Sequence, residues 1–265
     1  MSHSPLRFKS DKRVIALISW CSVVVLGLGL ADYVIVFLGF YPSKAVREIF
    51  DISREDALAT WFQSFQTLAI SVSLFLIYVS TKAMDHKKWI QRSWLFLSGV
   101  FLYLSIDDGA RLHERISGAL KNALGIYTWL GRYFPSYSWQ LVLGPIFVMI
   151  GFYMLWFLWR HFIRRFSFWL LFVAFALLFL AQSLDFIEGL RHPPYAELGA
   201  ILGFDERQIL HLSRLVEECL EMFGMGLILN AFLLQLFEMV ACIRITFKNS
   251  HNQLEIESIP ADVTS

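Results

Sequence analysis

The chain has little charge for its length. Only 17% of its 265 residues are Asp, Glu, Lys or Arg, whereas 57% are apolar and the mean hydropathy is +0.55. This composition excludes an ordinary soluble globular domain. The formal net charge is only +1, so the chain also lacks the basic surface of a nucleic-acid-binding protein, and we expect no nucleic-acid partner.

Cysteine is also scarce, and neither an internal repeat nor a low-complexity tract is present. The three cysteines, Cys21, Cys219 and Cys242, form no Cys-x-x-Cys motif. Cys219 is expected on the opposite side of the membrane from the other two, which argues against a disulfide framework. We interpret all three as small packing residues, with a metal thiolate at Cys219 as the alternative.

What the chain has in abundance is long apolar runs. Most are long enough to cross about 30 Å of hydrocarbon as helices. The six runs are Val14–Phe40, Ala57–Ser80, Ser93–Ile106, Trp139–Trp159, Phe166–Leu184 and Met222–Ile243. The first offers a cleavage-like Gly29-Leu30-Ala31 but continues past it, so we interpret it as a spanning helix and not a signal peptide. The sequence therefore predicts an all-α integral membrane bundle of six transmembrane helices.

The basic residues predict the orientation of this bundle. With a cytoplasmic N-terminus, the cytoplasmic side collects 13 of the 23 Lys and Arg residues, all in short tails and loops. These are Arg7, Lys9, Lys12, Arg13, Lys82, Lys87, Lys88, Arg92, Arg160, Arg164, Arg165, Arg244 and Lys248. The positive-inside rule then places both termini in the cytoplasm. We expect a cytoplasmic tail over 1–13, a transmembrane domain over 14–248 and a disordered cytoplasmic tail over 249–265.

The most informative stretch is His211 to Glu221, at the start of the last apolar run. On a helix, His211, Arg214, Glu218 and Glu221 share one face. Charged groups at the mouth of a membrane helix are costly unless something pairs with them. Partners are therefore expected on other helices.

Acidic groups on four helices are expected at the same level of the membrane. Measured along each helix from its cytoplasmic basic residue, Asp107, Asp185, Glu221 and Asp32 lie about 22 to 35 Å away. Gln63 and Gln66 of the second run could join them. We interpret these groups as one polar chamber at the outer mouth of the bundle.

Carboxylates and imidazoles that project inward from several helices are how bundles hold Fe, Mn or Zn. We therefore predict an outward-facing site for one or two divalent metal ions, exposed to membrane lipids or to a lipid- or quinone-like substrate. The predicted ligands are Asp108, His113, Glu114, Asp185, Glu188, His211, Glu218 and Glu221. The predicted supporting residues are Asp107, Arg111, Arg214, Glu217 and His192. If the protein is an enzyme, the metal would activate water or oxygen as a hydrolase or oxidoreductase.

Known metal motifs do not settle the chemistry. The chain has no Glu-x-x-His pair of the di-iron type, and the closely paired histidines of alkaline ceramidases and adiponectin receptors are absent. Two alternatives stay open. One is a cation- or proton-coupled transporter. The other is a structural or assembly protein in which Arg111, Arg191 and Arg214 neutralise acids as an interfacial ion-pair network.

Two motifs carry a resemblance to a known group. Ser105-Ile-Asp-Asp, with Leu-His-Glu ending at Glu114, is followed much later by Glu217-Glu-Cys-Leu-Glu-Met-Phe-Gly224. This pairing, over about Ser93 to Leu236, resembles uncharacterised bacterial polytopic inner-membrane proteins. The resemblance implies a multi-pass protein of a bacterial inner membrane and carries no known activity.

Overall fold

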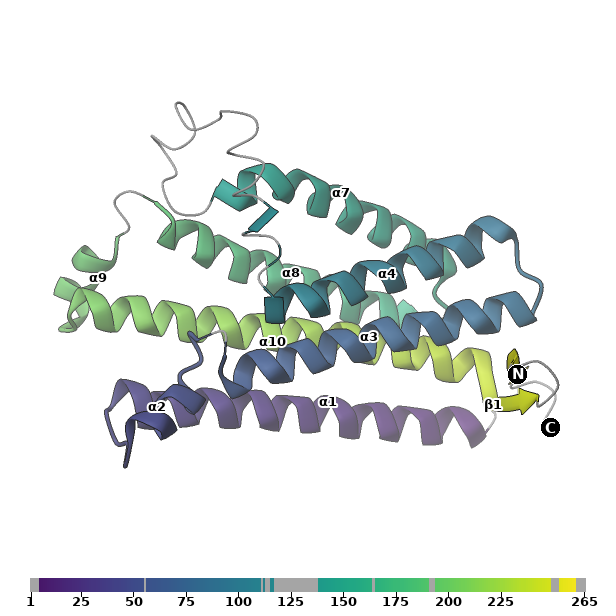
Figure 1. The fold of residues 1–265 in the computed structure, drawn as a ribbon, viewed down its shortest axis with the longest axis horizontal. Helices are drawn as coiled ribbons and strands as arrows, with labels where there is room; N and C mark the ends of the chain where they lie inside the picture. Colours follow the sequence, from purple (N-terminus) through teal and green to yellow (C-terminus); the bar gives the residue numbers. More distant parts are fainter. Residues whose placement is uncertain are drawn as a thin grey trace.

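The computed structural model describes residues 5–54, 56–110, 112, 115–116, 138–163, 165–190, 194–248 and 253–260. Within these ranges the protein is a helical bundle that ends in a short hairpin (Figure 1). In chain order the elements are α1 (Pro5–Asp32), η1 (Tyr33–Phe37), α2 (Lys44–Phe50), α3 (Leu58–Ala83), α4 (Lys88–Ala110), α7 (Ser138–His161), α8 (Arg165–Glu188), α9 (Tyr195–Leu202), α10 (Glu206–Met239), β1 (Val240–Lys248) and β2 (Gln253–Pro260).

Each of the six apolar runs corresponds to a long helix, and the helical prediction is confirmed. Five of the described helices, those that contain Ala16–Phe37, Leu58–Ala83, Leu143–His161, Arg165–Glu188 and Glu206–Met239, are long and apolar enough to cross a membrane. This is the pattern of a multi-pass membrane protein. α4 has 23 residues and the length of a span, but its polar ends lower its hydropathy.

The last helix is longer than its apolar run. α10 begins at Glu206 and not at Met222, because the amphipathic stretch before Met222 continues the same helix. Its 34 residues extend about 51 Å, well beyond the hydrocarbon thickness. At its other end α10 stops at Met239, and Val240–Lys248 form β1 where helix was expected up to Ile243. β2 pairs with β1 in antiparallel fashion, whereas the sequence predicted disorder over 249–265.

α10 runs through the bundle with α1, α3 and α8 packed beside it (Figure 1). Both ends of the described chain lie at one end of the bundle, together with the turn between α3 and α4. We call this the hairpin end. α2, α9 and the start of α10 lie at the opposite end, which we call the α9 end.

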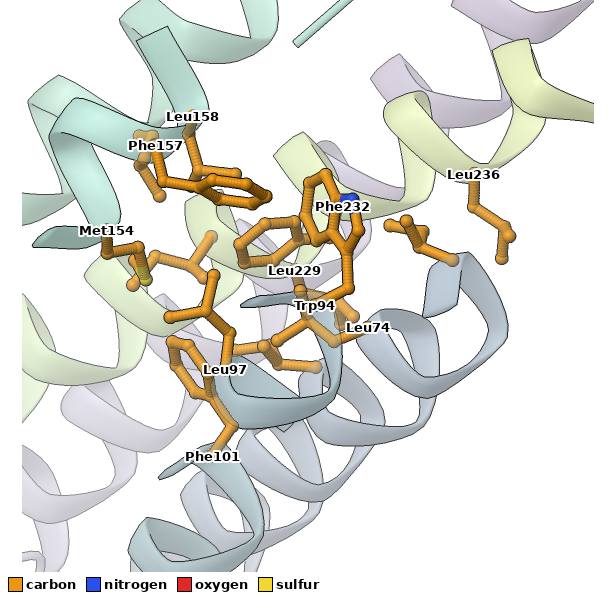
Figure 2. Packing of buried hydrophobic residues seen from close by; sticks show 14 of the residues in the cluster. Leu74, Trp94, Leu97, Phe101, Met154, Phe157, Leu158, Leu229, Phe232 and Leu236 are labelled. Atoms are coloured by element: carbon orange, nitrogen blue, oxygen red, sulfur yellow. The ribbon is translucent and has the colours of Figure 1, made fainter. Parts of the chain in front are cut away.

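An aromatic and aliphatic core occupies the half of the bundle nearer the hairpin end (Figure 2). Trp94 of α4 is 1% exposed, and its ring centroid lies 5.0 Å from that of Phe157 on α7 and 6.3 Å from that of Phe232 on α10. Both contacts are edge-to-face, the geometry that aromatic quadrupoles favour. Because apolar packing holds α3, α4, α7, α8 and α10 together here, polar side chains can gather in the other half.

Candidate functional site

A buried carboxylate at the end of α1 is held by two other segments. Asp32 is fully buried, and its Oδ2 lies 2.8 Å from Nε2 of His211 on α10. Its Oδ1 accepts a hydrogen bond of 3.0 Å from the backbone N–H of Ile52, which precedes α3. The chain widens into the π-helix η1 directly after Asp32, a distortion often found at functional sites. The sequence predicted partners for the His211 face on other helices, and in the structure the partner of His211 is Asp32 of α1.

Small residues bring α1 and α10 close enough for this pairing. A Cβ on Gly29 would lie 3.0 Å from Sγ of Cys219, and one on Gly226 would lie 3.6 Å from Cβ of Cys21. Such close approach over small residues is typical of helix packing in membranes. Three pairs of residues therefore face one another along the two antiparallel helices. They are Cys21 with Gly226, Gly29 with Cys219, and Asp32 with His211. Cys21 and Cys219 are free thiols in this packing.

Arg214 of α10 is bound to α8. Its Nε donates to Oε2 of Glu188 at 2.9 Å, and its Nη2 donates to Oε1 at 2.6 Å. This is the two-pronged geometry that makes Arg–carboxylate pairs strong. The sequence suggested that Arg214 could neutralise Glu218 on its own helix, and the structure shows a pair between helices instead.

Five acids from three helices form what we call the carboxylate cluster. Its members are Asp108 of α4, Asp185 of α8, and Glu217, Glu218 and Glu221 of α10. The carboxylate of Glu218 is close enough to feel the negative charges of Asp108, Asp185 and Glu221. The carboxylate of Glu217 feels those of Asp185 and Glu221. Acids that the sequence placed at one level of the membrane are thus neighbours in space.

Neutral amides donate to two members of the cluster. Nε2 of Gln63 on α3 lies 2.8 Å from Oε2 of Glu221, and Nε2 of Gln182 lies 2.9 Å from Oδ2 of Asp185. Among the described residues, the carboxylates of Glu217 and Glu218 have no hydrogen bond and no ion pair. Amide donors orient these two carboxylates without neutralising them.

The structure describes only some of the predicted metal ligands. In the described part of the chain, no group of three or more His, Cys, Asp or Glu side chains has the arrangement of a metal site. Four predicted site residues lie outside the described residues, namely Arg111, His113, Glu114 and His192. Asp107 is 7% exposed and lies on α4 beside Asp108. The arrangement described so far is a carboxylate cluster flanked by the Arg214–Glu188 and His211–Asp32 pairs.

A family model described as "Domain of unknown function (DUF8692)" matches residues 17–236. The chain belongs to the DUF8692 family. No curated protein and no solved structure matches it.

The range shared with the DUF8692 family contains the whole site. It starts within α1 and ends near the end of α10, so it includes Asp32, His211, the Arg214–Glu188 pair and every member of the carboxylate cluster. The β1–β2 hairpin lies outside it. The family match therefore covers the bundle that builds the site and says nothing of its chemistry.

Proposed function

We propose that the protein is a six-span protein of a bacterial inner membrane, with both termini in the cytoplasm. α4 is the sixth span in this proposal, because its 23 residues extend about 34 Å and it packs along α3. The hairpin end then faces the cytoplasm, in agreement with Lys82, Lys87 and Lys88 near the turn between α3 and α4. A reporter active only outside the cytoplasm is expected to be active when fused after Gly203 and inactive when fused after Lys248.

We further propose that the carboxylate cluster binds a divalent cation at the outer face of the membrane. The supporting observation is that charges on α4, α8 and α10 converge on Glu218, while Arg214 is already engaged by Glu188. Carboxylates that share a low-dielectric site repel one another unless protons or a cation balance them. Along α10, Glu218 lies about 32 Å from Met239, which is about the thickness of the hydrocarbon layer. With Met239 at the cytoplasmic edge, Glu218 would lie at the outer edge, where ions have access.

In this proposal the ligands come from the carboxylate cluster and from the sequence that follows Asp108. Asp108, Asp185, Glu218 and Glu221 would supply oxygen donors. His113 and Glu114, two predicted ligands outside the described residues, would complete the site. Oxygen donors alone suit Mn, and an imidazole donor also suits Fe or Zn. Glu188 and His211 have other partners in the structure, so we assign them a positioning role.

The chemistry we propose is activation of water or oxygen against a lipid- or quinone-like molecule. A bound cation at the membrane surface would act as a Lewis acid there. A carboxylate of the cluster that does not coordinate the cation would be able to accept a proton from a bound water.

Elemental analysis of the detergent-purified protein tests this proposal. We expect one or two equivalents of Fe, Mn or Zn in the wild type, and loss of the metal in Asp185→Asn and Glu218→Gln. Glu48→Gln, at an acid of α2 outside the cluster, serves as the control and should keep the metal. A folded wild type that stays metal-free after incubation with each of the three ions would refute the proposal.

A second candidate function, cation- or proton-coupled transport, is favoured by buried polar groups deeper in the bundle. Gln66, Asn230 and Gln235 are buried along α3 and α10 toward the hairpin end. Nδ2 of Asn230 donates to the carbonyl of Gly226, and Oε1 of Gln235 accepts from the backbone of Ile163. A polar path through the membrane would need such groups. Ion flux in proteoliposomes that is lost in Asn230→Leu would favour transport over a one-sided site.

A further inference from the structure

A half-open groove lies between α3 and α4, beside the carboxylate cluster. Its cavity volume is about 390 Å³, within the usual range for small-molecule sites. Trp61, Phe65 and Leu68 of α3 form one wall, and Ile106 and Gly109 of α4 form the other. The groove is therefore large enough for part of an amphiphilic molecule.

The polarity of the groove changes along its length. Asp56 and Thr60 lie at the start of α3, toward the α9 end, whereas Leu68 lies two turns deeper. Ser64 and Ser105 lie between these ends, where Oγ of Ser105 donates to the backbone oxygen of Ser64 at 3.0 Å. This hydrogen bond joins the two walls. The groove thus offers polar groups at the membrane surface and apolar groups below it, the order in which a lipid presents its headgroup and its chain.

Side chains on both walls of the groove are exposed. Trp61 and Phe65 are each 62% exposed, and Ile106 is 51% exposed. α3 meets the length and hydropathy of a span. Aromatic side chains exposed there contact lipid and not water. An occupant must therefore come from the membrane.

Asp56 lines the polar end of the groove and pairs with Arg54 of the preceding segment, whose Nη1 also lies 3.7 Å from Oε1 of Glu48. Arg54 donates from Nε and Nη2 to the two carboxylate oxygens of Asp56, at 3.0 and 2.9 Å. A guanidinium next to a carboxylate complements a phosphate next to an ammonium group. A zwitterionic phospholipid headgroup has that arrangement.

We propose that the groove between α3 and α4 is a specific site for one zwitterionic phospholipid. One acyl chain lies between Phe65, Leu68 and Ile106, and the headgroup lies at the Arg54–Asp56 pair. The same turn of α4 carries Ile106 and Gly109 on the groove and Asp108 in the carboxylate cluster. The bound lipid is therefore held next to the proposed cation site, but its binding does not require a cation.

Filling the groove tests the proposal. A Cβ on Gly109 would meet nothing within 4 Å, so Gly109→Leu starts a side chain from open space on the groove wall. Gly99, on the same helix and outside the groove, also has nothing within 4 Å and gives the matched control Gly99→Leu. The three proteins are delipidated, incubated with phosphatidylethanolamine in detergent and examined by native mass spectrometry. We expect one retained lipid in the wild type and in Gly99→Leu, and none in Gly109→Leu.

A cross-linking measurement on an otherwise unaltered groove removes any dependence on the folding of Gly109→Leu. A photoreactive residue replaces Phe65 in the groove or Phe96, which is 48% exposed on α4 and outside it. With one equivalent of phosphatidylethanolamine, cross-links are expected from position 65 alone. Equal cross-linking at both positions, or equal retention in all three proteins, would mean annular lipid only and would overturn the proposal. Metal content is measured on the same samples, so failure of the lipid site and failure of the cation site are told apart.

Discussion

Oδ2 of Asp32 lies 2.8 Å from Nε2 of His211, and this contact joins the first long helix of the bundle to the last. The carboxylate is fully buried, whereas the His211 side chain is 19% exposed. Both oxygens of the buried carboxylate have partners, because Oδ1 accepts a hydrogen bond from the backbone N–H of Ile52. Three segments of the chain therefore depend on one side chain for their relative position at the α9 end.

Removing either member of this pair should destabilise the fold, and unequally. His211→Ala leaves the Asp32 carboxylate buried without its side-chain partner, and we expect a loss of about 3 kcal/mol in the free energy of unfolding. Asp32→Asn removes the carboxylate and keeps its shape, so a loss of about 1 to 2 kcal/mol is expected. Denaturant unfolding in detergent measures both.

The double variant separates this contact from other effects of each substitution. Because the two side chains touch, the combined loss should be smaller than the sum of the single losses by about 1 kcal/mol or more. Additive losses would show that Asp32 and His211 contribute independently and that the contact is not what holds α1 against α10.

The Arg214–Glu188 pair should contribute more to stability than a surface pair. Arg214 binds both oxygens of Glu188, whose side chain is 11% exposed, so Arg214→Gln is expected to cost about 1 to 2 kcal/mol. Arg214→Lys should recover only part of this, because an ammonium group cannot bind both oxygens in the same plane. The same unfolding measurement applies.

Lys44 and Glu48 provide the matched control for that prediction. Their closest atoms are 3.6 Å apart in α2, and the Lys44 side chain is 87% exposed. Lys44→Gln should change the free energy of unfolding by less than about 0.5 kcal/mol. If Lys44→Gln and Arg214→Gln lower the free energy of unfolding equally, the Arg214–Glu188 pair stabilises the protein no more than a surface pair does.

The sequence was sufficient to predict the helices, because apolar runs of membrane length have few other ways to satisfy their backbone. It also predicted that Asp107, Asp185, Glu221 and Asp32 would lie at one level, since distance along a helix is a local property. In α10, the shared face of the polar residues predicted helix from His211 onward, and only the first residues, from Glu206, were missed.

The partners of His211 and Arg214 could not be read from sequence, because pairing between helices depends on how the helices are rotated and placed. From the sequence, His211 was a predicted metal ligand with unidentified partners on other helices, and Arg214 was a possible partner of Glu218 on its own helix. In the sequence, Asp32 is an acid within an apolar run and nothing nearby identifies its partner. In the structure, the close packing of Gly29 against Cys219 brings His211 to it. No local pattern specifies that α1 packs on α10 in this register.

Close packing against α8 makes Gly224 intolerant of a side chain. A Cβ there would lie 3.0 Å from the side chain of Leu178 and 3.3 Å from the backbone oxygen of Ala174. Gly224→Ala should therefore destabilise the bundle by about 1 to 3 kcal/mol through overpacking, even though alanine favours helix. Thermal unfolding in detergent is the measurement.

Gly27 of α1 gives the control for Gly224. A Cβ on Gly27 would meet nothing within 4 Å, so Gly27→Ala should be neutral or stabilise by up to about 1 kcal/mol. Equal effects of the two substitutions would indicate that α8 and α10 are not in contact at Gly224.

Tyr195 should make stability depend on pH in the alkaline range. The residue is 4% exposed in α9, outside the membrane-crossing segments, and its hydroxyl lies 3.3 Å from Oγ of Ser213. Burial is the largest influence on the phenol and raises its pKa above the ordinary value near 10. The unfolded chain then loses this proton at a lower pH than the folded protein does. The stabilisation is fully present below about pH 10 and declines as the pH rises from there through the pKa of the folded protein.

Tyr195→Phe tests that dependence because it keeps the ring and removes the titrating group. The stability of the wild type is expected to fall more steeply than that of the variant above about pH 10. Phenolate absorbance, taken as the difference between wild type and variant, follows the same proton in the folded protein and should titrate later than an exposed tyrosine. If the difference spectrum instead titrates at the ordinary pKa, the Tyr195 ring is solvated and α9 does not pack on α10 through this side chain.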